Sequence, residues 1–278
     1  MQSRFHEKAK ENIMIVAHRG VAGGNIPCNT LAAYEIALKQ GADVIEIDVS
    51  RSLDGELFLF HPSMELAHLN KLVLLPTLLF SVIKKLRYVN YDNTPTQFGI
   101  SSLDDFLEQF KGRCFINIDK FWSNPEKIYN TIKYHGMTEQ VLVKSKINKN
   151  VIKVLEELCP ELPFMPIVHD THPFHEDLMK KNINYVGAEF VFLNENAPVA
   201  QDAFIEKMHK DNKLVWLNSI IYNYKDQLAG GHSDDTALTV SEDYGWGWLA
   251  DKGADFIQTD WPMMLIDYLK KTGKYCRD

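Results

Sequence analysis

The sequence predicts a closed barrel of eight parallel strands with helices between them, a (βα)8 barrel. Three observations lead to this prediction. The chain has 278 residues, a length that such barrels commonly occupy. Short apolar runs recur along its whole length, and helical patterns separate most of them. Because this alternation is typical of parallel βα units, we expect residues 1–278 to form one barrel domain.

The expected strands are nine apolar runs, at 13–18, 43–48, 56–61, 114–119, 140–145, 163–168, 184–190, 213–218 and 255–260. One is therefore additional to the barrel. The segment between the second and third runs is too short for a crossover helix, which needs about a dozen residues, and Asp54-Gly55 is a strong hairpin signal. The third run should thus fold back antiparallel on the second. Paired residue numbers then sum to about 108, which places His61 opposite Ile47.

Helix signals lie between the runs. Thr30 is an expected N-cap and Gly41 an expected C-terminal stop for one helix, and Ser102 and Gly112 play the same parts for another. Residues 62–101 should form a small helical insertion, since the apolar segment 69–86 contains a proline and three lysines. That segment is too polar for a membrane span, which takes about 20 apolar residues. Ordinary packing is the favoured interpretation of its apolar face, and contact with a lipid-like substrate is the alternative.

Composition narrows the functional classes. The net charge of −7 and the lack of a basic stripe argue against nucleic-acid binding. Four cysteines, at 28, 114, 159 and 276, show no CxxC pair, so we expect reduced thiols. The N-terminal residues lack the apolar region of a signal peptide, which predicts a cytoplasmic protein. The sequence does not indicate an oligomeric state.

Acidic residues interrupt the second strand. Glu46 and Asp48 are two residues apart and share one face, where two unpaired buried carboxylates would cost several kcal/mol each. Asp119 ends the next barrel strand. A divalent cation, Mg²⁺ or Ca²⁺, would compensate these hard oxygen ligands. The alternative is ion pairing with Arg19 or Lys120.

Two histidines favour the metal site. His18 and His61 each end an apolar strand near the same acids, and the C-terminal strand ends are where barrels of this class carry their functional residues. A pair of histidines beside a metal site fits a general acid and a general base.

The motifs resemble those of the glycerophosphodiester phosphodiesterase family, whose members are TIM barrels. "AHRG", "NT" before a helix, and "GADVIEIDVSRSLDGELFLFH" follow the family's first block in order. "SSLDDFLEQFKGRCFINID", "VWLN" and "GADFIQTDWP" extend the likeness over nearly the whole chain.

The resemblance implies a metal-dependent hydrolase that cleaves small-molecule glycerophosphodiesters to glycerol 3-phosphate and an alcohol. By matching position, His18 and His61 would be the acid–base pair, and Arg19 would bind the phosphate. The implied metal ligands are Glu46, Asp48 and Asp119. The alternatives are a phosphodiesterase of the same architecture acting on a lipid or another phosphodiester, and a catalytically weakened barrel that binds phosphodiesters.

Three positions depart from the family pattern. Cys28 replaces a glutamate, Pro62 replaces an aspartate that would orient His61, and Phe121 replaces a lysine. Lys120 should point away from Asp119 on an ideal strand. Lys144, at the end of the next strand, is therefore a candidate phosphate contact, with a plain surface lysine as the alternative.

Six further positions are weaker candidates. Trp216 could contact substrate or belong to the core. His232 and Asp234, in the long loop 228–249, could line the site or belong to a surface lid. The segment "HDTHPFH" suggests a metal site through His169 and His172, but it starts the loop after a different strand from the acids, and we discount it together with Glu189.

Overall fold

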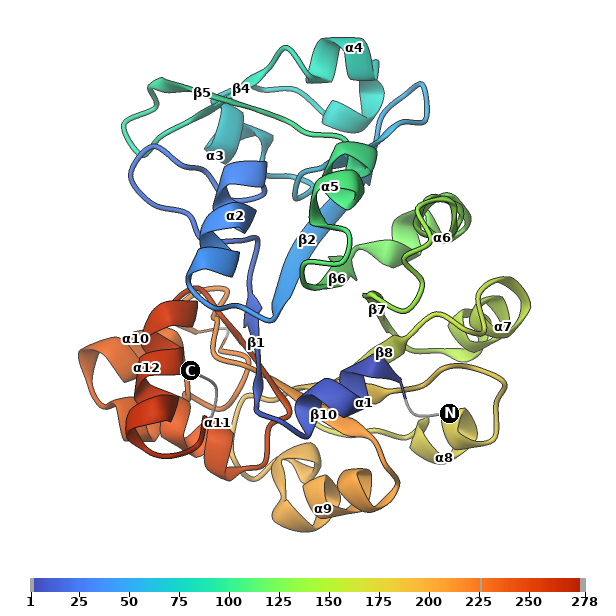
Figure 1. Cartoon of the computed structure of the whole chain (residues 1–278), viewed down its shortest axis with the longest axis vertical. Coiled ribbons are helices and arrows are strands. Elements are labelled where there is room, and N and C mark those ends of the chain that lie inside the picture. The colour runs from blue at the N-terminus through green and yellow to red at the C-terminus, as the bar shows by residue number, and fades with distance from the viewer. Residues whose placement is uncertain (1–2, 226, 276–278) are drawn as a thin grey trace.

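The computed structural model describes residues 3–225 and 227–275. Eight of its strands are parallel and close into a ring (Figure 1). In order around the ring these strands are β1 (Met14–Ala17), β2 (Val44–Arg51), β6 (Phe115–Asp119), β7 (Val141–Lys146), β8 (Phe164–His169), β9 (Gly187–Val191), β10 (Leu214–Asn218) and β11 (Phe256–Thr259). Since β11 pairs with β1 and β1 with β2, the barrel is closed and the predicted fold class is confirmed.

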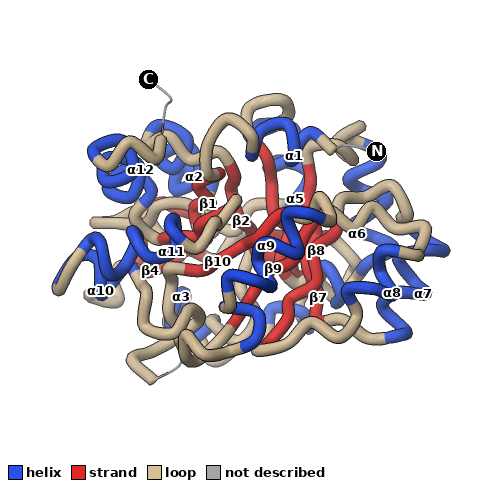
Figure 2. Tube along the Cα trace, turned by 90° about the horizontal axis from the view of Figure 1, so that it is seen from below, coloured by secondary structure: helices blue, strands red, loops and turns tan. Residues whose placement is uncertain are grey.

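Helices surround the ring, and Figure 2 shows the strands enclosed by them. They are α1 (Arg4–Ala9), α2 (Leu31–Lys39), α5 (Leu103–Phe110), α6 (Pro125–Tyr134), α7 (Lys149–Leu158), α8 (His175–Met179), α9 (Asp202–Lys210), α10 (Asp234–Thr239), α11 (Trp248–Asp251) and α12 (Pro262–Lys271). The predicted caps are present: the Thr30 side chain accepts from the Ala33 amide, and Ser102 accepts from the Asp105 amide. Gly41 adopts a φ of 92° after the first of these helices, where a Cβ would be strained.

The extra strand lies where the hairpin signal placed it. β3 (Leu57–Leu59) pairs antiparallel with β2, and Val49 faces Leu59 in the predicted register. The Phe60 amide continues the ladder by donating to the Asp48 carbonyl. His61 follows directly, so the hairpin delivers it beside the acids of β2.

The insertion after β3 is more varied than the sequence suggested. It contains α3 (Glu65–Leu69) and α4 (Phe80–Ile83), as expected, and also a two-stranded antiparallel sheet of β4 (Arg87–Val89) and β5 (Pro95–Gly99). In Figure 1 it forms the upper part of the molecule, beyond α2 and α5. Leu69, Leu75, Ile83 and Tyr88 build a small core of its own.

Apolar side chains fill the lower interior of the barrel. Phe5 of α1 packs with Val16, Val44, Trp216 and Phe256 from the strands. This layer is fully buried and forms the floor beneath the polar residues at the C-terminal strand ends.

Cys28, Cys114 and Cys159 are unpaired, whereas Cys276 lies outside the described residues. Among the helices of the described ranges, none is both long and apolar enough to cross a membrane.

Candidate active site

Three carboxylates meet at the C-terminal end of the barrel. Glu46 and Asp48 come from one strand, and Asp119 from its neighbour, where it pairs in register with Asp48. One oxygen of each lies within 4.8 Å of the others, close enough to share a cation. Asp48 Oδ1 is buried with no hydrogen-bond partner. An orphaned carboxylate oxygen in such a cluster fits the donor set of a hard divalent cation.

Two cations also contact these acids. Arg19 Nε lies 3.0 Å from Asp48 Oδ2, and the Arg19 backbone amide donates to Glu46 Oε2 at 2.8 Å. The Lys120 ammonium contacts Asp119 and lies 4.0 Å from Asp48 Oδ1. The ion pairs and a carboxylate cluster that could hold a cation are therefore present at the same place.

Left-handed backbone explains both contacts. Arg19 has a φ of 56° and Gly20 of 76°, a turn that aims the Arg19 amide at Glu46. A Cβ on Gly20 would lie 2.7 Å from the Ala33 carbonyl carbon, so only glycine fits. Lys120 has a φ of 60°, which turns its side chain back toward Asp119. The expectation that Lys120 points away was wrong because the strand ends at Asp119.

Asn29 is a site residue that the sequence reasoning missed. Its Nδ2 donates to Asp48 Oδ2 at 2.9 Å, while its Oδ1 accepts from Tyr34 Oη at 2.9 Å. Asn29 is itself buried, with a φ of 55°. The signal was available in the "NT" of the first motif, which was used only to recognise the family.

Burial and neighbouring charges shift the pKa values of Glu46 and Asp119 in opposite directions. Burial and the neighbouring Asp48 carboxylate raise the pKa of Glu46 to about 7. Burial also opposes ionisation of Asp119, but the Lys120 and Lys144 ammonium groups hold its pKa below the usual range. Of Glu46 and Asp119, Glu46 is therefore the carboxyl whose ionised form is disfavoured unless a further cation lies nearby.

The two histidines have different partners. His18 Nδ1 lies 2.9 Å from Asp260 Oδ1, which follows β11. Although burial opposes its protonation, Asp260 and Glu46 raise the pKa of His18. His61 Nδ1 donates to the Pro62 carbonyl at 2.8 Å, and burial is the main cause of its lowered pKa. The backbone of Pro62 thus orients His61 where the family's aspartate side chain is missing.

Lys144 is buried, which excludes the surface alternative. Its Nζ lies 2.7 Å from Glu189 Oε2 and 3.8 Å from the centre of the Trp216 ring. Asn218 completes this network by donating to Glu189 and accepting from Trp216. Trp216 is fully buried and stacks on Phe256. Lys144 is thus paired with Glu189 and also acts on Asp119 through its charge.

Cys28 and Phe121, which depart from the family pattern, are both in apolar or enclosed surroundings. Phe121 is fully buried in the core outside the barrel. Burial raises the pKa of the Cys28 thiol to about 12, so it is uncharged. Cys28 Sγ lies 3.8 Å from His68 Nδ1, and both residues line a cavity of about 250 Å³ between the loop after β1 and the insertion.

The segment 228–249, expected to be a long loop, is largely helical and contains α10 and the start of α11, and both candidate residues in it have structural roles. Asp234 is buried and accepts from Trp246 Nε1 at 2.7 Å and from Thr259 Oγ1 at 2.8 Å. Its second oxygen accepts from the Asp260 amide at 2.8 Å. His232 is buried and stacks on Trp248. Asp234 therefore acts on the site only through Asp260, the partner of His18.

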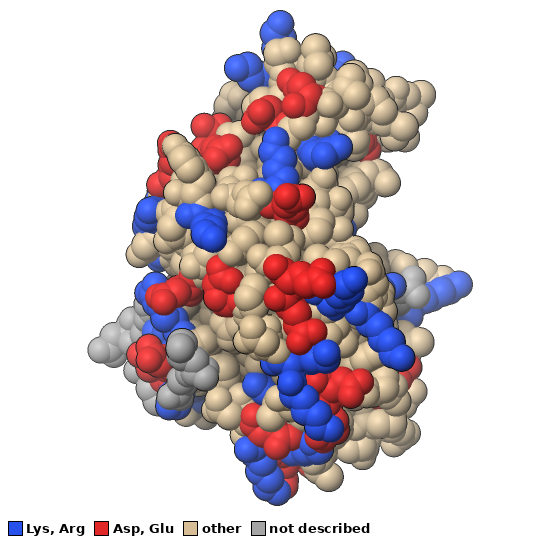
Figure 3. Space-filling view, turned by 90° about the vertical axis from the view of Figure 1, so that its right-hand side faces the viewer, with Lys and Arg blue, Asp and Glu red and all other residues tan. Residues whose placement is uncertain are grey.

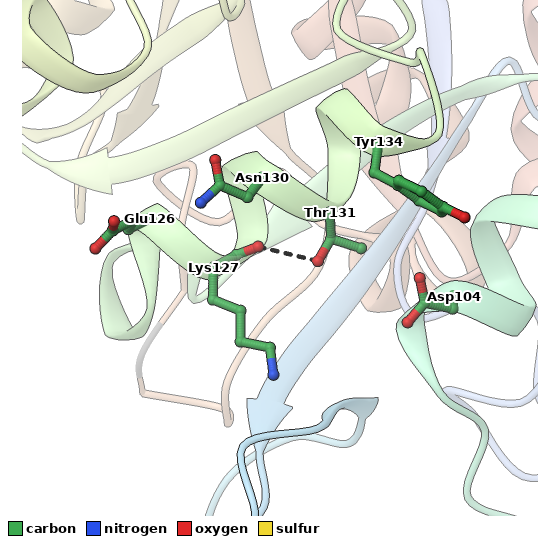
Figure 4. A pocket seen from close by; sticks show the side chains of 6 residues that line it. All are labelled: Asp104, Glu126, Lys127, Asn130, Thr131 and Tyr134. Atoms are coloured by element: carbon green, nitrogen blue, oxygen red, sulfur yellow. Dashed lines mark hydrogen bonds between the residues drawn. The ribbon is translucent and has the colours of Figure 1, made fainter.

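Other polar groups lie away from the acids. His175, Glu176 and Asp211 are near enough to share a cation, but Lys207 Nζ already lies 2.7 Å from Glu176 and 2.8 Å from Asp211. A hollow of about 370 Å³ lies outside the barrel along α6 and is lined by Asp104, Glu126, Lys127, Asn130, Thr131 and Tyr134 (Figure 4). It contains none of the site residues.

His172 gives a prediction about acid stability. Its Nε2 lies 2.9 Å from Tyr185 Oη, it is buried, and burial lowers its pKa to about 4 from 6.5. The unfolded chain then binds more protons between these values, so stability is complete above pH 6.5 and is lost as the pH falls toward 4. In His172→Gln, which keeps an N–H for Tyr185, we expect the loss over this range to shrink by up to about 3 kcal/mol. Urea unfolding at several pH values measures it, and equal pH slopes for both proteins would contradict it.

Fold and site together define a barrel protein with a carboxylate cluster, two histidines and an arginine at the catalytic end of its strands. A family model described as a domain of unknown function matches residues 164–269. The uncharacterized protein YqiK of Bacillus subtilis is 31% identical over 272 residues, which cover 92% of this chain and 98% of that protein.

A glycerophosphodiester phosphodiesterase of Bacillus subtilis is 27% identical over 178 residues, 57% of this chain and 60% of that protein. The solved structure of an Oleispira antarctica phosphodiesterase, in complex with the product sn-glycerol-3-phosphate, shares 18% identity. It superposes with a TM-score of 0.67 over 95% of this chain and 99% of that one. The chain belongs to the glycerophosphodiester phosphodiesterase family.

Proposed function

We propose that this protein hydrolyses glycerophosphodiesters to glycerol 3-phosphate and an alcohol, with Mg²⁺ or Ca²⁺ held by Glu46, Asp48 and Asp119. The observation that carries the proposal is the convergence of these carboxylates beside His18 and His61. The named phosphodiesterase relative and the product complex of the structural neighbour support the substrate class.

The charges of the site favour binding of a divalent cation together with the phosphodiester substrate. When Glu46, whose pKa is about 7, is ionised together with Asp48 and Asp119, the three carboxylates exceed the charges of Arg19 and Lys120 by one. A divalent cation changes this to one positive charge, and a phosphodiester anion then restores neutrality. When bound, the cation supplies Lewis-acid stabilisation of charge on the phosphoryl oxygens. Arg19 adds a fixed cation at the same place.

The histidines divide the proton transfers. His61 donates its Nδ1–H to Pro62, so a neutral ring presents the Nε2 lone pair. It takes the proton of the substrate's glycerol hydroxyl as that oxygen attacks phosphorus. His18, held by Asp260, gives its Nε2 proton to the leaving alcohol oxygen. Water then opens the resulting cyclic phosphate, with the two roles reversed.

We propose that Lys144 and Trp216 form the floor of the substrate site and do not contact the phosphate directly. Lys144 is committed to Glu189, whereas Lys120 lies at the carboxylates. We therefore assign the direct phosphate contact expected of Lys144 to Lys120, and the charge of Lys144 stabilises the ionised form of Asp119.

The test is release of glycerol 3-phosphate from glycerophosphocholine and glycerophosphoethanolamine with Mg²⁺, with Ca²⁺ and with EDTA. We expect metal-dependent turnover, and a loss of about 10² to 10⁴-fold in His18→Ala, because general acid–base catalysis contributes about that much. Turnover that survives EDTA would contradict the metal. A folded protein inactive with either metal and both substrates would contradict this substrate class.

A further inference from the structure

The insertion exposes an unusual number of aliphatic side chains. Leu72 is 90% exposed, Leu74 65% and Leu79 47%. Leu66 and Val82 of the same segment are also exposed, and so is Leu53 of the β2–β3 turn. We call these six residues, Leu53, Leu66, Leu72, Leu74, Leu79 and Val82, the apolar rim. Exposed apolar groups gathered in one short segment indicate an interaction surface.

The apolar rim is not a poorly formed core. Leu69, Leu75 and Ile83 alternate with the rim residues along the chain and are buried against Phe58 and Phe60. The segment therefore satisfies its own core and still presents a second apolar face to solvent. The favoured expectation of ordinary packing therefore holds for Leu69, Leu75 and Ile83, but not for the exposed residues of the apolar rim.

Two hydrogen bonds fix part of this face at the catalytic end of the barrel. β2 continues past Asp48 to Arg51, so the turn after it lies beyond the carboxylates. The Leu53 amide donates to the Leu78 carbonyl at 2.9 Å, and the Phe80 amide donates to Asp54 Oδ1 at 2.9 Å. These bonds hold Leu79 against the turn that carries Leu53.

Exposed basic side chains lie in the same chain segment as most of the apolar rim. Between residues 66 and 91 the chain contains Lys71, Lys84, Lys85 and Arg87, all exposed, and no Asp or Glu. This is a local reversal in a chain of net charge −7. Figure 3 shows basic side chains at the upper tip of the molecule, the end where Figure 1 places the insertion. The acids that border this segment in the sequence are Glu65, which is buried, and Asp92, which is exposed; Asp54 of the neighbouring turn accepts from the Phe80 amide.

We propose that the apolar rim and its four basic residues dock the protein on an anionic phospholipid surface. Aliphatic groups would enter the boundary between headgroups and acyl chains, while the lysines and Arg87 would bind the negative headgroups. Such docking would place the catalytic end of the barrel near the membrane. The inference goes beyond the hydrolysis proposed above, since docking needs neither metal nor turnover.

The test is cosedimentation of the full chain with vesicles of phosphatidylcholine and phosphatidylglycerol in equal parts, and with phosphatidylcholine alone. We expect binding to the mixed vesicles that weakens as salt screens the basic residues. The double variant Leu72→Ser/Leu74→Ser should bind at least about tenfold more weakly, because it removes inserted apolar surface. Lys84→Gln/Lys85→Gln should lose about tenfold on the mixed vesicles, and the loss should vanish at high salt.

Matched controls separate docking from other effects. Val240→Ser removes an equally exposed aliphatic group outside the insertion, and Lys149→Gln removes a basic residue there; both should bind like the parent. Hydrolysis of a water-soluble glycerophosphodiester should be the same in all variants, so a failure of docking is distinct from a failure of the proposed activity. Equal binding by the double leucine variant would overturn the proposal. So would a parent protein that ignores vesicles but forms a dimer that Leu72→Ser/Leu74→Ser dissociates, since a second copy would then cover the rim.

Discussion

Asp48→Asn should abolish the response of the protein to divalent cations. Asp48 is fully buried; its Oδ2 accepts from Asn29 Nδ2 and lies 3.0 Å from Arg19 Nε. The carbonyl oxygen of the variant's amide would keep the Asn29 hydrogen bond and the contact with Arg19. Its NH2 would then stand where Oδ1 now faces Glu46 and Asp119 without a partner. Because an amide nitrogen does not ligate Mg²⁺ or Ca²⁺, one ligand is lost and a donor points into the site.

Thermal unfolding with and without metal measures this effect without any assay of turnover. A cation present at a hundredfold excess over its dissociation constant stabilises the parent protein by about 2.7 kcal/mol. We expect a clear rise in melting temperature for the parent, none for Asp48→Asn, and at least a hundredfold loss of turnover. Asp105→Asn, an exposed change on α5, should retain both. An unchanged metal-dependent shift in Asp48→Asn would remove this carboxylate from the ligand set.

Local patterns were enough to predict the barrel. Each parallel strand is a short apolar run, and its position in the ring follows from the order of the runs in the chain. The Asp54-Gly55 turn also specified the register of the hairpin, because turn geometry determines which residues face each other. His61 could therefore be placed beside the β2 acids without any tertiary information.

Two side-chain contacts of the site, His18 with Asp260 and Lys120 with Asp119, could not be predicted from any local pattern. Asp260 follows the last barrel strand and reaches His18, which follows the first. Lys120 reaches Asp119 only because its backbone is left-handed, which the alternation rule for strands does not anticipate. The β4–β5 pair was missed for another reason: its strands are short, and most of their residues are not buried, so their apolar pattern is weak.

Asp234, the first residue of α10, shows how a residue outside the site can control it. Its carboxylate accepts from Trp246, Thr259 and the Asp260 amide, and thereby ties the loop 228–249 to the end of β11. Asp234→Ala leaves these buried donors without an acceptor. Loss of a buried network of this kind costs about 3 to 5 kcal/mol, so we expect Asp234→Ala to unfold at markedly lower urea concentration than the parent.

Asp234→Ala should also lower the catalytic rate. Asp260 loses the bond that fixes its backbone, so the fraction of protein with Asp260 placed on His18 falls. We expect kcat to fall while the metal-dependent thermal shift persists, since Asp234 does not contact the carboxylate cluster. Asp235→Asn, at the adjacent exposed position, is the control and should change neither stability nor kcat. If Asp234→Ala is destabilised but keeps the parent's kcat, then Asp260 holds its place without this loop, and the role of Asp234 is confined to folding.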